Sequence, residues 1–309
     1  MKVVAANGAR RDDLLPSPDD LARAREAIAA AGVEPTVIVR HGKTTFAIES
    51  LRPEGSFKVR GAVVALAKRR EHVIAASAGN HGIGVASAAQ RLGLGATVVV
   101  PKTAPRKKVD TILSFGVEVI EEGTGYDEAE AFALELAKKR GVRFLSPYDD
   151  VDVVAGNGGT LGLELAPLRP TKVIAPIGGG GLATGLACAL GNDRIVWGAQ
   201  SDASPAFALS LEKGEAQVTL PYAETLADGI EGGIAKDAFA RAAGVCAGAL
   251  VVSEESIALA MRWAFRELGL VIEGSSGAAL AAAMTFDEEV TVVLTGRNVD
   301  PDTLARVLW

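Results

Sequence analysis

Short apolar runs rich in β-branched residues alternate with longer amphipathic stretches along most of the chain. Because parallel strands need long crossover connections, this alternation predicts mostly parallel sheets with helices on both faces, an α/β fold. The eight runs that we expect to form buried strands are Val73–Ala76, Thr97–Val100, Glu118–Ile120, Arg143–Leu145, Val173–Ile177, Ile195–Ala199, Leu250–Ser253 and Val290–Leu294.

The segment before the first of these runs shows other patterns. Residues 1–16 mix acidic and basic side chains without a periodic apolar pattern, and we expect them to form a loose arm. Ser17 and Pro18, followed by two acids, form a helix start, so a helix is predicted from here to about Ala31. The other elements that we expect are a hairpin of Val37–Arg40 with Thr45–Glu49 and a short final helix over Pro301–Trp309.

Composition narrows the functional classes. The 309 residues, 49% of them hydrophobic, predict a sizeable core and about two domains. A net charge of −6 does not favour a nucleic-acid partner. Only two cysteines, Cys188 and Cys246, exclude a disulfide scaffold and fit a reducing cytosol. Because no run of 18 apolar residues and no secretory pattern occurs, we expect a cytoplasmic protein with no membrane partner.

Five turns rich in glycine, serine or asparagine follow predicted strands and precede predicted helices. In open α/β sheets, ligands bind at the carboxyl ends of strands beside helix N-termini, so these turns are the candidate site. The strongest is Gly178–Leu182, where four consecutive glycines expose backbone N–H groups at a helix start and form a cradle for a phosphate. The other four are Gly55–Ala62, Ser77–Gly82, Gly156–Thr160 and Leu294–Asn298.

Each of these other turns has a plainer structural interpretation beside its functional one. Lys58 begins a predicted helix, where burial would lower its pKa and supply a neutral amine for imine chemistry, although lysines are mostly solvated. Ser77 and Asn80 suit either anion binding or ordinary helix capping. His81 is a candidate general base, but a lone histidine is more often structural. The Thr295 hydroxyl suits either a hydrogen bond to a ring nitrogen of a ligand or the capping of the final helix.

The glycine turn also fits the dinucleotide-binding pattern G-x-G-x-x-A through Gly178, Gly180 and Ala183. That fold needs an acid about 20 residues further on, at the end of the next strand, to bind the ribose. Gln200 stands there and cannot serve as an anionic acceptor, which argues against a nicotinamide cofactor. Asp202 lies just beyond and leaves that alternative open.

Taken together and in this order, the five turns resemble the pyridoxal-phosphate enzymes of fold type II, and within them the threonine/serine dehydratases and serine racemase. The resemblance covers roughly Glu49 to Asp300. It implies two open, mostly parallel twisted sheets flanked by helices, with pyridoxal 5′-phosphate between two domains. The implied small domain spans residues 71–147, and the large cofactor-binding domain spans residues 1–70 and 148–309.

The resemblance also assigns roles to single residues. Lys58 is implied as the catalytic, Schiff-base lysine, with Phe57 packing beside the cofactor ring. Asn80 would bond the cofactor's 3-hydroxyl group and Thr295 would face its pyridine nitrogen. The other implied cofactor contacts are Glu273 and the phosphate-binding residues Gly178, Gly179, Gly180, Gly181 and Leu182. The residues implied around the substrate are Ser77, Ala78, Gly79, Asn80 and His81.

Several positions depart from that family. Pro35-Thr36-Val37 stands in place of the usual Thr-Pro-Leu. Arg297 occupies a site that is commonly glycine, and a permanent cation near Thr295 adds acidic β-hydroxy amino acids to the candidate substrates. Asn157 replaces a common glutamine, in a turn whose glycines suit a close backbone approach, a flexible joint between domains or a plain loop.

Two further departures concern metal and stereochemistry. Gln200 and Ala206 stand where serine racemase has metal-binding acids, so we expect no metal. Ala78 stands at the position of the serine that donates a proton in serine racemase, so we expect little racemisation.

The function that follows is β-elimination from a β-hydroxy amino acid such as L-threonine or L-serine, giving a 2-oxo acid and ammonia. Once displaced from the cofactor, a neutral Lys58 amine beside Cα can take its proton. An amino-acid racemase or a β-replacement enzyme is the alternative within the family. A non-catalytic ligand-binding or sensor protein is the alternative from another class. A homodimer is a family expectation.

Overall fold

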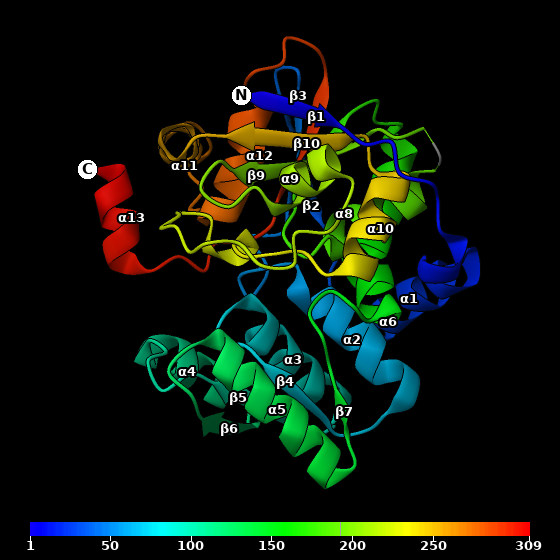
Figure 1. Ribbon diagram of the computed structural model, residues 1–309, viewed down its shortest axis with the longest axis vertical. Coiled ribbons are helices and arrows are strands. Elements are labelled where there is room, and N and C mark those ends of the chain that lie inside the picture. The colour runs from blue at the N-terminus through cyan, green and yellow to red at the C-terminus, as the bar shows by residue number, and fades with distance from the viewer. Residues whose placement is uncertain (192) are drawn as a thin grey trace.

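Two β-sheets flanked by helices form two lobes, stacked along the long axis of the molecule (Figure 1). The computed structural model describes residues 1–191 and 193–309. The larger sheet has seven strands in the order β1-β10-β9-β8-β11-β3-β2, and the smaller has four in the order β6-β5-β4-β7. The expected α/β fold with two mostly parallel sheets is confirmed, since among the strands of the described residues only β1 and β2 pair antiparallel with their neighbours.

The elements have these bounds. The seven-stranded sheet contains β1 (Lys2–Ala5), β2 (Val37–His41), β3 (Thr44–Ile48), β8 (Val173–Pro176), β9 (Val196–Ser201), β10 (Gly248–Val252) and β11 (Val290–Leu294). The four-stranded sheet contains β4 (Val73–Ala76), β5 (Ala96–Val100), β6 (Glu118–Glu121) and β7 (Arg143–Phe144). The α-helices are α1 (Pro18–Ala30), α2 (Lys58–Arg69), α3 (Asn80–Leu92), α4 (Arg106–Leu113), α5 (Tyr126–Arg140), α6 (Val151–Val154), α7 (Thr160–Leu165), α8 (Gly181–Leu190), α9 (Ala206–Lys213), α10 (Lys236–Val245), α11 (Glu254–Leu268), α12 (Gly274–Ala283) and α13 (Pro301–Leu308). Short 3₁₀ turns are η1 (Asp12–Leu14), η3 (Ala166–Leu168) and η4 (Asp228–Ile230), and η2 (Ala155–Gly159) is π-helical.

The local patterns of the sequence account for most of these bounds. All eight expected strands are present within two residues of their expected ends, and β2 and β3 form the expected hairpin. Helix α1 begins with the expected cap, because the Ser17 hydroxyl accepts from the Asp20 amide at 3.2 Å. The final helix α13 is also present, with Asp300 as its cap.

The N-terminal segment is not the loose arm that its mixed charges predicted. Residues Lys2–Ala5 form the edge strand β1, antiparallel to β10. Arg194 secures the chain that follows, since its guanidinium donates to the carbonyls of Ala6 and Gly8 at 3.3 and 2.8 Å. It also donates to the carbonyls of Ala243, Gly244 and Cys246 beside them. Both contacts join segments far apart in the sequence, which a local pattern does not record.

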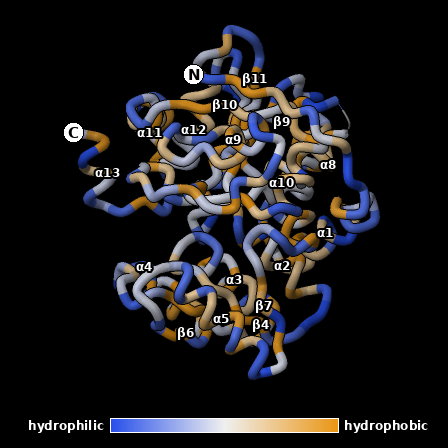
Figure 2. Tube along the Cα trace, in the orientation of Figure 1, coloured by the Kyte–Doolittle hydropathy of each residue, from blue (hydrophilic) through white to orange (hydrophobic). Residues whose placement is uncertain are grey.

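Each face of the seven-stranded sheet carries its own apolar core. One contains α7, α8, α9 and α10, and the other contains α11 and α12. All ten residues of α12 are buried, and every one is glycine, alanine, serine or leucine, so this helix lies flat between the sheet and α11. Figure 2 shows hydrophobic stretches gathered inside the lobes and hydrophilic stretches along outer loops. Among the described residues, no helix has the length and hydropathy needed to cross a bilayer.

Helix α2 lies between the two lobes (Figure 1). It packs against α3 of the smaller lobe on one side and against the π-helical turn η2 on the other. The first residue of this helix, Lys58, therefore lies between the two sheets. The carboxyl end of β4 in the smaller sheet and those of β8 and β11 in the larger sheet face this region.

Candidate active site

Three of the five turns are joined by hydrogen bonds, and the glycine turn packs against Tyr148, the neighbour of Pro147, whose carbonyl oxygen lies 3.5 Å from Lys58 Nζ. Lys58 begins α2, Asn80 begins α3 and Gly181 begins α8, while Thr295 directly follows β11. Hydrogen bonds join the segments of Lys58, Asn80 and Thr295. The Phe57 amide donates to the Thr295 carbonyl at 3.0 Å. The Asn298 side chain donates to the Asn80 side chain at 2.7 Å.

The Lys58 side chain is half-buried, which argues against the interpretation of an ordinary solvated lysine. Its Nζ lies 3.5 Å from the Pro147 carbonyl oxygen and 5.2 Å from the centre of the Phe57 ring. Desolvation lowers the pKa of Lys58 to about 8, although the Glu273 carboxylate opposes that shift. A substantial fraction of this amine is therefore neutral near physiological pH, as a nucleophile or proton acceptor requires.

Glu273, at the N-terminus of α12, stands at the centre of a buried hydrogen-bond chain. Its carboxylate accepts from the Asn80 amide at 2.8 Å and from the Thr295 hydroxyl at 3.0 Å. The Ser276 hydroxyl lies 3.0 Å from the Thr295 hydroxyl on the other side. Burial raises the pKa of Glu273 to about 7, so this carboxyl changes charge close to neutral pH.

The sequence did not identify two residues of this hydrogen-bond network: Ser276, which contacts Thr295, and Asn298, which donates to Asn80. Asn298 joins the smaller lobe to the segment before Lys58, since its amide also donates to the Glu54 carbonyl at 3.0 Å. Asn298 ends one of the five turns that the sequence singled out, three residues after Thr295, and Ser276 lies in the first turn of α12, three residues after Glu273. Their polar side chains near these two residues in the sequence were the signal available.

His81 is held in a way that favours its structural interpretation. Its Nε2 lies 2.9 Å from the Leu145 carbonyl oxygen, and the ring is buried. Desolvation, together with the charge of Lys58, lowers the pKa of His81 to about 3. The ring is therefore neutral, and Nε2 donates to the carbonyl rather than accepting a proton from a substrate.

The glycine turn fits a phosphate group. An added Cβ at Gly178 would lie 2.9 Å from Ile230 Cα, and one at Gly179 would lie 2.5 Å from the Tyr148 ring. Gly180 has a φ of 79° and directly precedes α8, so its conformation also favours glycine. The first amides of α8 have no partner within the helix and point toward this turn.

Arg297 does not extend toward Thr295. Its guanidinium donates to the carbonyl of Ser50 and, at 2.8 Å, to that of Arg52. The backbone N–H of Arg297 also donates to Gly55 at 2.9 Å. This residue therefore secures the segment that leads to Lys58, and its engagement with that segment argues against a role in binding an acidic substrate.

Gln200 is engaged with the helix that follows it. Its Oε1 accepts from the Ala208 amide at 3.0 Å, within the first turn of α9. The described residues contain no cluster of three or more His, Cys, Asp or Glu side chains that could hold a metal ion.

The turn at 156–160 is neither a loop nor a flexible joint. Residues Ala155–Gly159 form the π-helical turn η2, buried between α2 and α8. Its glycines serve the close backbone approach that was one of the expected uses, because an added Cβ at Gly156 would lie 2.6 Å from Gly61 Cα.

Comparison with known proteins identifies the family. A family model described as pyridoxal-phosphate dependent enzyme matches residues 33–296. The chain belongs to this family. Its cofactor is pyridoxal phosphate, which removes the nicotinamide alternative.

Individual relatives agree with this assignment. The chain is 36% identical to an L-threonine ammonia-lyase of Thermotoga maritima over 285 residues, covering 87% of this chain and 71% of the relative. The processed form of threonine deaminase isoform 2 from Solanum lycopersicum superposes with a TM-score of 0.88 at 29% identity, covering 99% of this chain and 91% of that one. Maize serine racemase superposes with a TM-score of 0.86 at 25% identity, covering 97% of both chains.

Proposed function

We propose that the protein is an ammonia-lyase that acts on L-threonine, L-serine or a similar β-hydroxy amino acid. The substrate loses its β-hydroxyl group as water, and the remaining enamine hydrolyses to a 2-oxo acid and ammonia. The observation that carries the proposal is a half-buried amine of lowered pKa, Lys58, which lies 3.5 Å from the Pro147 carbonyl oxygen. The next residue, Tyr148, packs against the glycine turn that we propose as the cradle for phosphate. Similarity to threonine ammonia-lyases supports the substrate class.

Pyridoxal phosphate bound here supplies an electron sink that makes the Cα proton of an attached amino acid removable. In the proposal, Lys58 holds the group covalently and, when released by substrate, accepts the Cα proton at Nζ. The amides of Gly178–Leu182 hold the phosphate, while Phe57 packs beside the ring. Asn80 and Thr295 orient the ring through hydrogen bonds, as Glu273 orients both of them.

The turn Ser77–His81 is proposed to hold the substrate carboxylate. It connects β4 to α3, and the Gly79 amide donates to the Ser77 hydroxyl at 3.1 Å, which gives the turn a defined shape. The positive end of the α3 dipole favours an anion there. His81 then serves to fix the turn through its bond to Leu145 rather than as a base.

The proposal extends to the organisation of the molecule. We infer a small domain of residues 71–147, which contains all four strands of the smaller sheet, and a large domain of residues 1–70 and 148–309. A homodimer in the cytoplasm is part of the same proposal. Cys188 and Cys246 are both free thiols, which fits a reducing compartment.

Replacing Lys58 tests this function. We expect Lys58→Ala to abolish borohydride-reducible attachment of the cofactor and nearly all 2-oxo acid release from L-threonine, because both need that amine. Lys68→Ala is the matched control, since Lys68 lies on the same helix but pairs with Asp152 at 2.7 Å away from the site. Full attachment in Lys58→Ala would mean that another lysine holds the cofactor. A wild-type protein that is colourless with added cofactor would favour the sensor alternative.

A further inference from the structure

The first turn of α2 lacks a cap of its own. Phe57, at the N-cap position, has helical dihedral angles and no side-chain bond to the amides that follow. A helix start leaves several N–H groups without partners inside the helix, and a buried N–H needs a partner from elsewhere. This matters because Lys58 is the first residue of that turn.

The missing acceptor comes from Asn157, in the π-helical turn η2. The Gly61 amide donates to Asn157 Oδ1 at 2.9 Å, across 96 positions of sequence. Asn157 is only 2% exposed, so water does not compete for that bond. The approach is possible because both sides are glycine-rich: an added Cβ at Gly61 would lie 2.7 Å from the Asn157 side chain.

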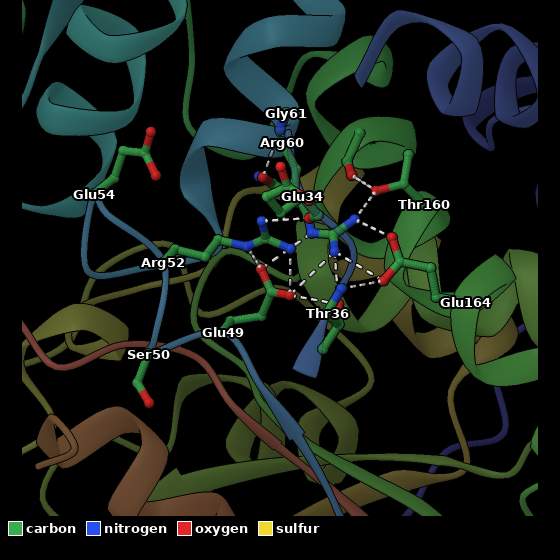
Figure 3. Close-up of polar contacts among 12 residues, drawn as sticks. Glu34, Thr36, Glu49, Ser50, Arg52, Glu54, Arg60, Gly61, Thr160 and Glu164 are labelled. Carbon is green, nitrogen blue, oxygen red and sulfur yellow. Dashed lines mark hydrogen bonds and ion pairs between the residues drawn. The ribbon is translucent and has the colours of Figure 1, made fainter. Parts of the chain in front are cut away.

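The residue before Gly61 is fixed to the same part of the chain (Figure 3). The Arg60 side chain is fully buried and donates to Thr160 Oγ1 at 3.0 Å and to Glu164 Oε1 at 2.9 Å. It also donates to Glu49 Oε2 at 3.0 Å. Two successive residues of the first turns of α2 are thus bound to the segment that begins with η2.

The other side of η2 packs against α8, the helix that begins at the glycine cradle. An added Cβ at Gly158 would overlap the Leu182 carbonyl oxygen, and one at Gly185 would overlap that of Val154. The π-helical turn therefore touches both the helix that begins with Lys58 and the helix that begins at Gly181. A π-helical turn within a helix is uncommon and often marks a functional site.

We propose that Asn157 is a positioning residue for Lys58: its amide oxygen caps α2 from η2 and so fixes the Lys58 amine relative to the glycine cradle at the start of α8. The inference rests on the proposed function of Lys58. Without the acceptor, the Gly61 amide is buried unpaired, and the first turn of α2 relaxes to satisfy it. A displacement of about 1 Å at a reacting group costs about 100-fold in rate.

The test compares Asn157→Leu with Asn157→Gln in the holoenzyme. Leucine has nearly the shape of asparagine but no acceptor, whereas glutamine keeps a neutral amide oxygen. For Asn157→Leu we expect kcat to fall about 10- to 100-fold, KM to change less than about threefold, and the pH midpoint of the visible cofactor band to move by at least about 0.5. Asn157→Gln should recover most of kcat and return the midpoint toward wild type.

A control separates positioning from general stability. Asp300→Ala removes the cap of α13, whose Asp300 side chain accepts from the Asp302 amide at 2.9 Å, and should lower Tm without changing kcat or the band. If Asn157→Leu does not fold, Asn157→Ser replaces it, because the shorter hydroxyl also leaves the Gly61 amide unpaired.

Three results would overturn the proposal. One is an unchanged band and kcat in a folded Leu or Ser variant whose Tm is lower. Another is a Gln variant as impaired as these two. The third is that neither Leu nor Ser folds while Gln alters Tm alone. All three assume that Lys58→Ala has abolished attachment of the cofactor, so a failure of the proposed function is recognised separately.

Discussion

The surroundings of Glu273 favour the protonated form of its carboxyl group. Only 4% of the residue is exposed, and its neighbours from other elements are Asn80 of α3, Thr295 after β11 and the Lys58 amine. Asp228, in η4, adds a like charge that raises the pKa of Glu273 further. Because burial is the largest cause, the charged form is the one that the fold disfavours.

This predicts how stability depends on pH. The pKa of Glu273 in the folded protein, about 7, lies above the ordinary 4.5. The stabilising contribution of the protonated carboxyl is therefore complete below pH 4.5 and is lost as pH rises through 7. Without cofactor, we expect wild type to lose about 2 kcal/mol more between pH 5 and 7 than Glu273→Gln, which does not titrate.

Thermal unfolding followed by circular dichroism at the two pH values measures this difference. Glu215→Gln is the control, because Glu215 is an exposed glutamate after α9 and should follow wild type. Parallel pH dependence in wild type and Glu273→Gln would contradict the elevated pKa.

Ala78 predicts the stereochemical outcome. It lies in the turn between β4 and α3 that we propose to hold the substrate carboxylate, and its methyl group can neither donate nor accept a proton. Reprotonation of Cα from the face opposite Lys58 then has no donor at this position. We expect wild type to eliminate with little exchange between D- and L-serine, and Ala78→Ser to raise racemisation relative to elimination by about 10-fold or more.

Chiral chromatography of residual serine, run beside a pyruvate assay, gives both rates from one reaction. Wild-type racemisation as fast as elimination would refute the argument from Ala78. An unchanged ratio in Ala78→Ser would show that this turn does not face Cα.

At the scale of elements, the end of β9 predicts the response to metal removal. Gln200 uses its amide oxygen to bind the first turn of α9, and Ala206 in that turn offers only a methyl group. A divalent ion needs anionic or carbonyl oxygen ligands, and two such acids are absent at these positions. We therefore expect EDTA to change activity by less than about twofold, or about 0.4 kcal/mol. A large loss that magnesium or calcium restores would place a metal site elsewhere.

The elements also show where sequence patterns succeed and fail. Buried strands such as Val73–Ala76 and Val290–Leu294 were found because every residue faces a core on one side or the other, so the apolar run is local information. The turns were found because glycine and asparagine at strand ends have few other uses. The site residues Ser276 and Asn298 were not found, because their importance lies in bonds to Thr295, Asn80 and Glu54 from distant segments.

The sequence patterns did not predict the π-helical turn or β1, for related reasons. Nothing in Ala155–Gly159 distinguishes a π-helical turn from a loop until α2 and α8 press on it from both sides. Lys2–Ala5 has one partially buried position among four, so its pairing with β10 comes from backbone bonds and from Arg194 rather than from an apolar pattern.

At the scale of the whole molecule, Arg194 predicts how the N-terminal segment is retained. Its backbone has a positive φ of 47°. Its guanidinium donates to five carbonyls, two in the segment that follows β1 and three in the segment that precedes β10. Arg194→Ala leaves those carbonyls without a charged donor, and we expect a loss of about 2 to 3 kcal/mol in unfolding free energy. Faster hydrogen exchange at residues 2–8 should accompany it.

Arg40→Ala is the matched control at the opposite edge of the same sheet. Arg40 pairs with Glu289 on the surface, and both side chains are more than half exposed, so the expected change is within about 0.5 kcal/mol. Equal losses in the two variants would show that the Arg194 contacts add nothing beyond an ordinary surface pair.

The strand order of the larger sheet has a consequence for the growing polypeptide. β11, the last strand to be synthesised, lies between β8 and β3, so the sheet stays divided until Val290–Leu294 leaves the ribosome. The smaller sheet is complete once Phe144 has emerged, since its four strands are consecutive along the chain. During translation one lobe can already be ordered while the other exposes two unpaired strand edges, which are templates for aggregation. The nascent chain is thus most vulnerable over its final third, and chaperone demand should concentrate there.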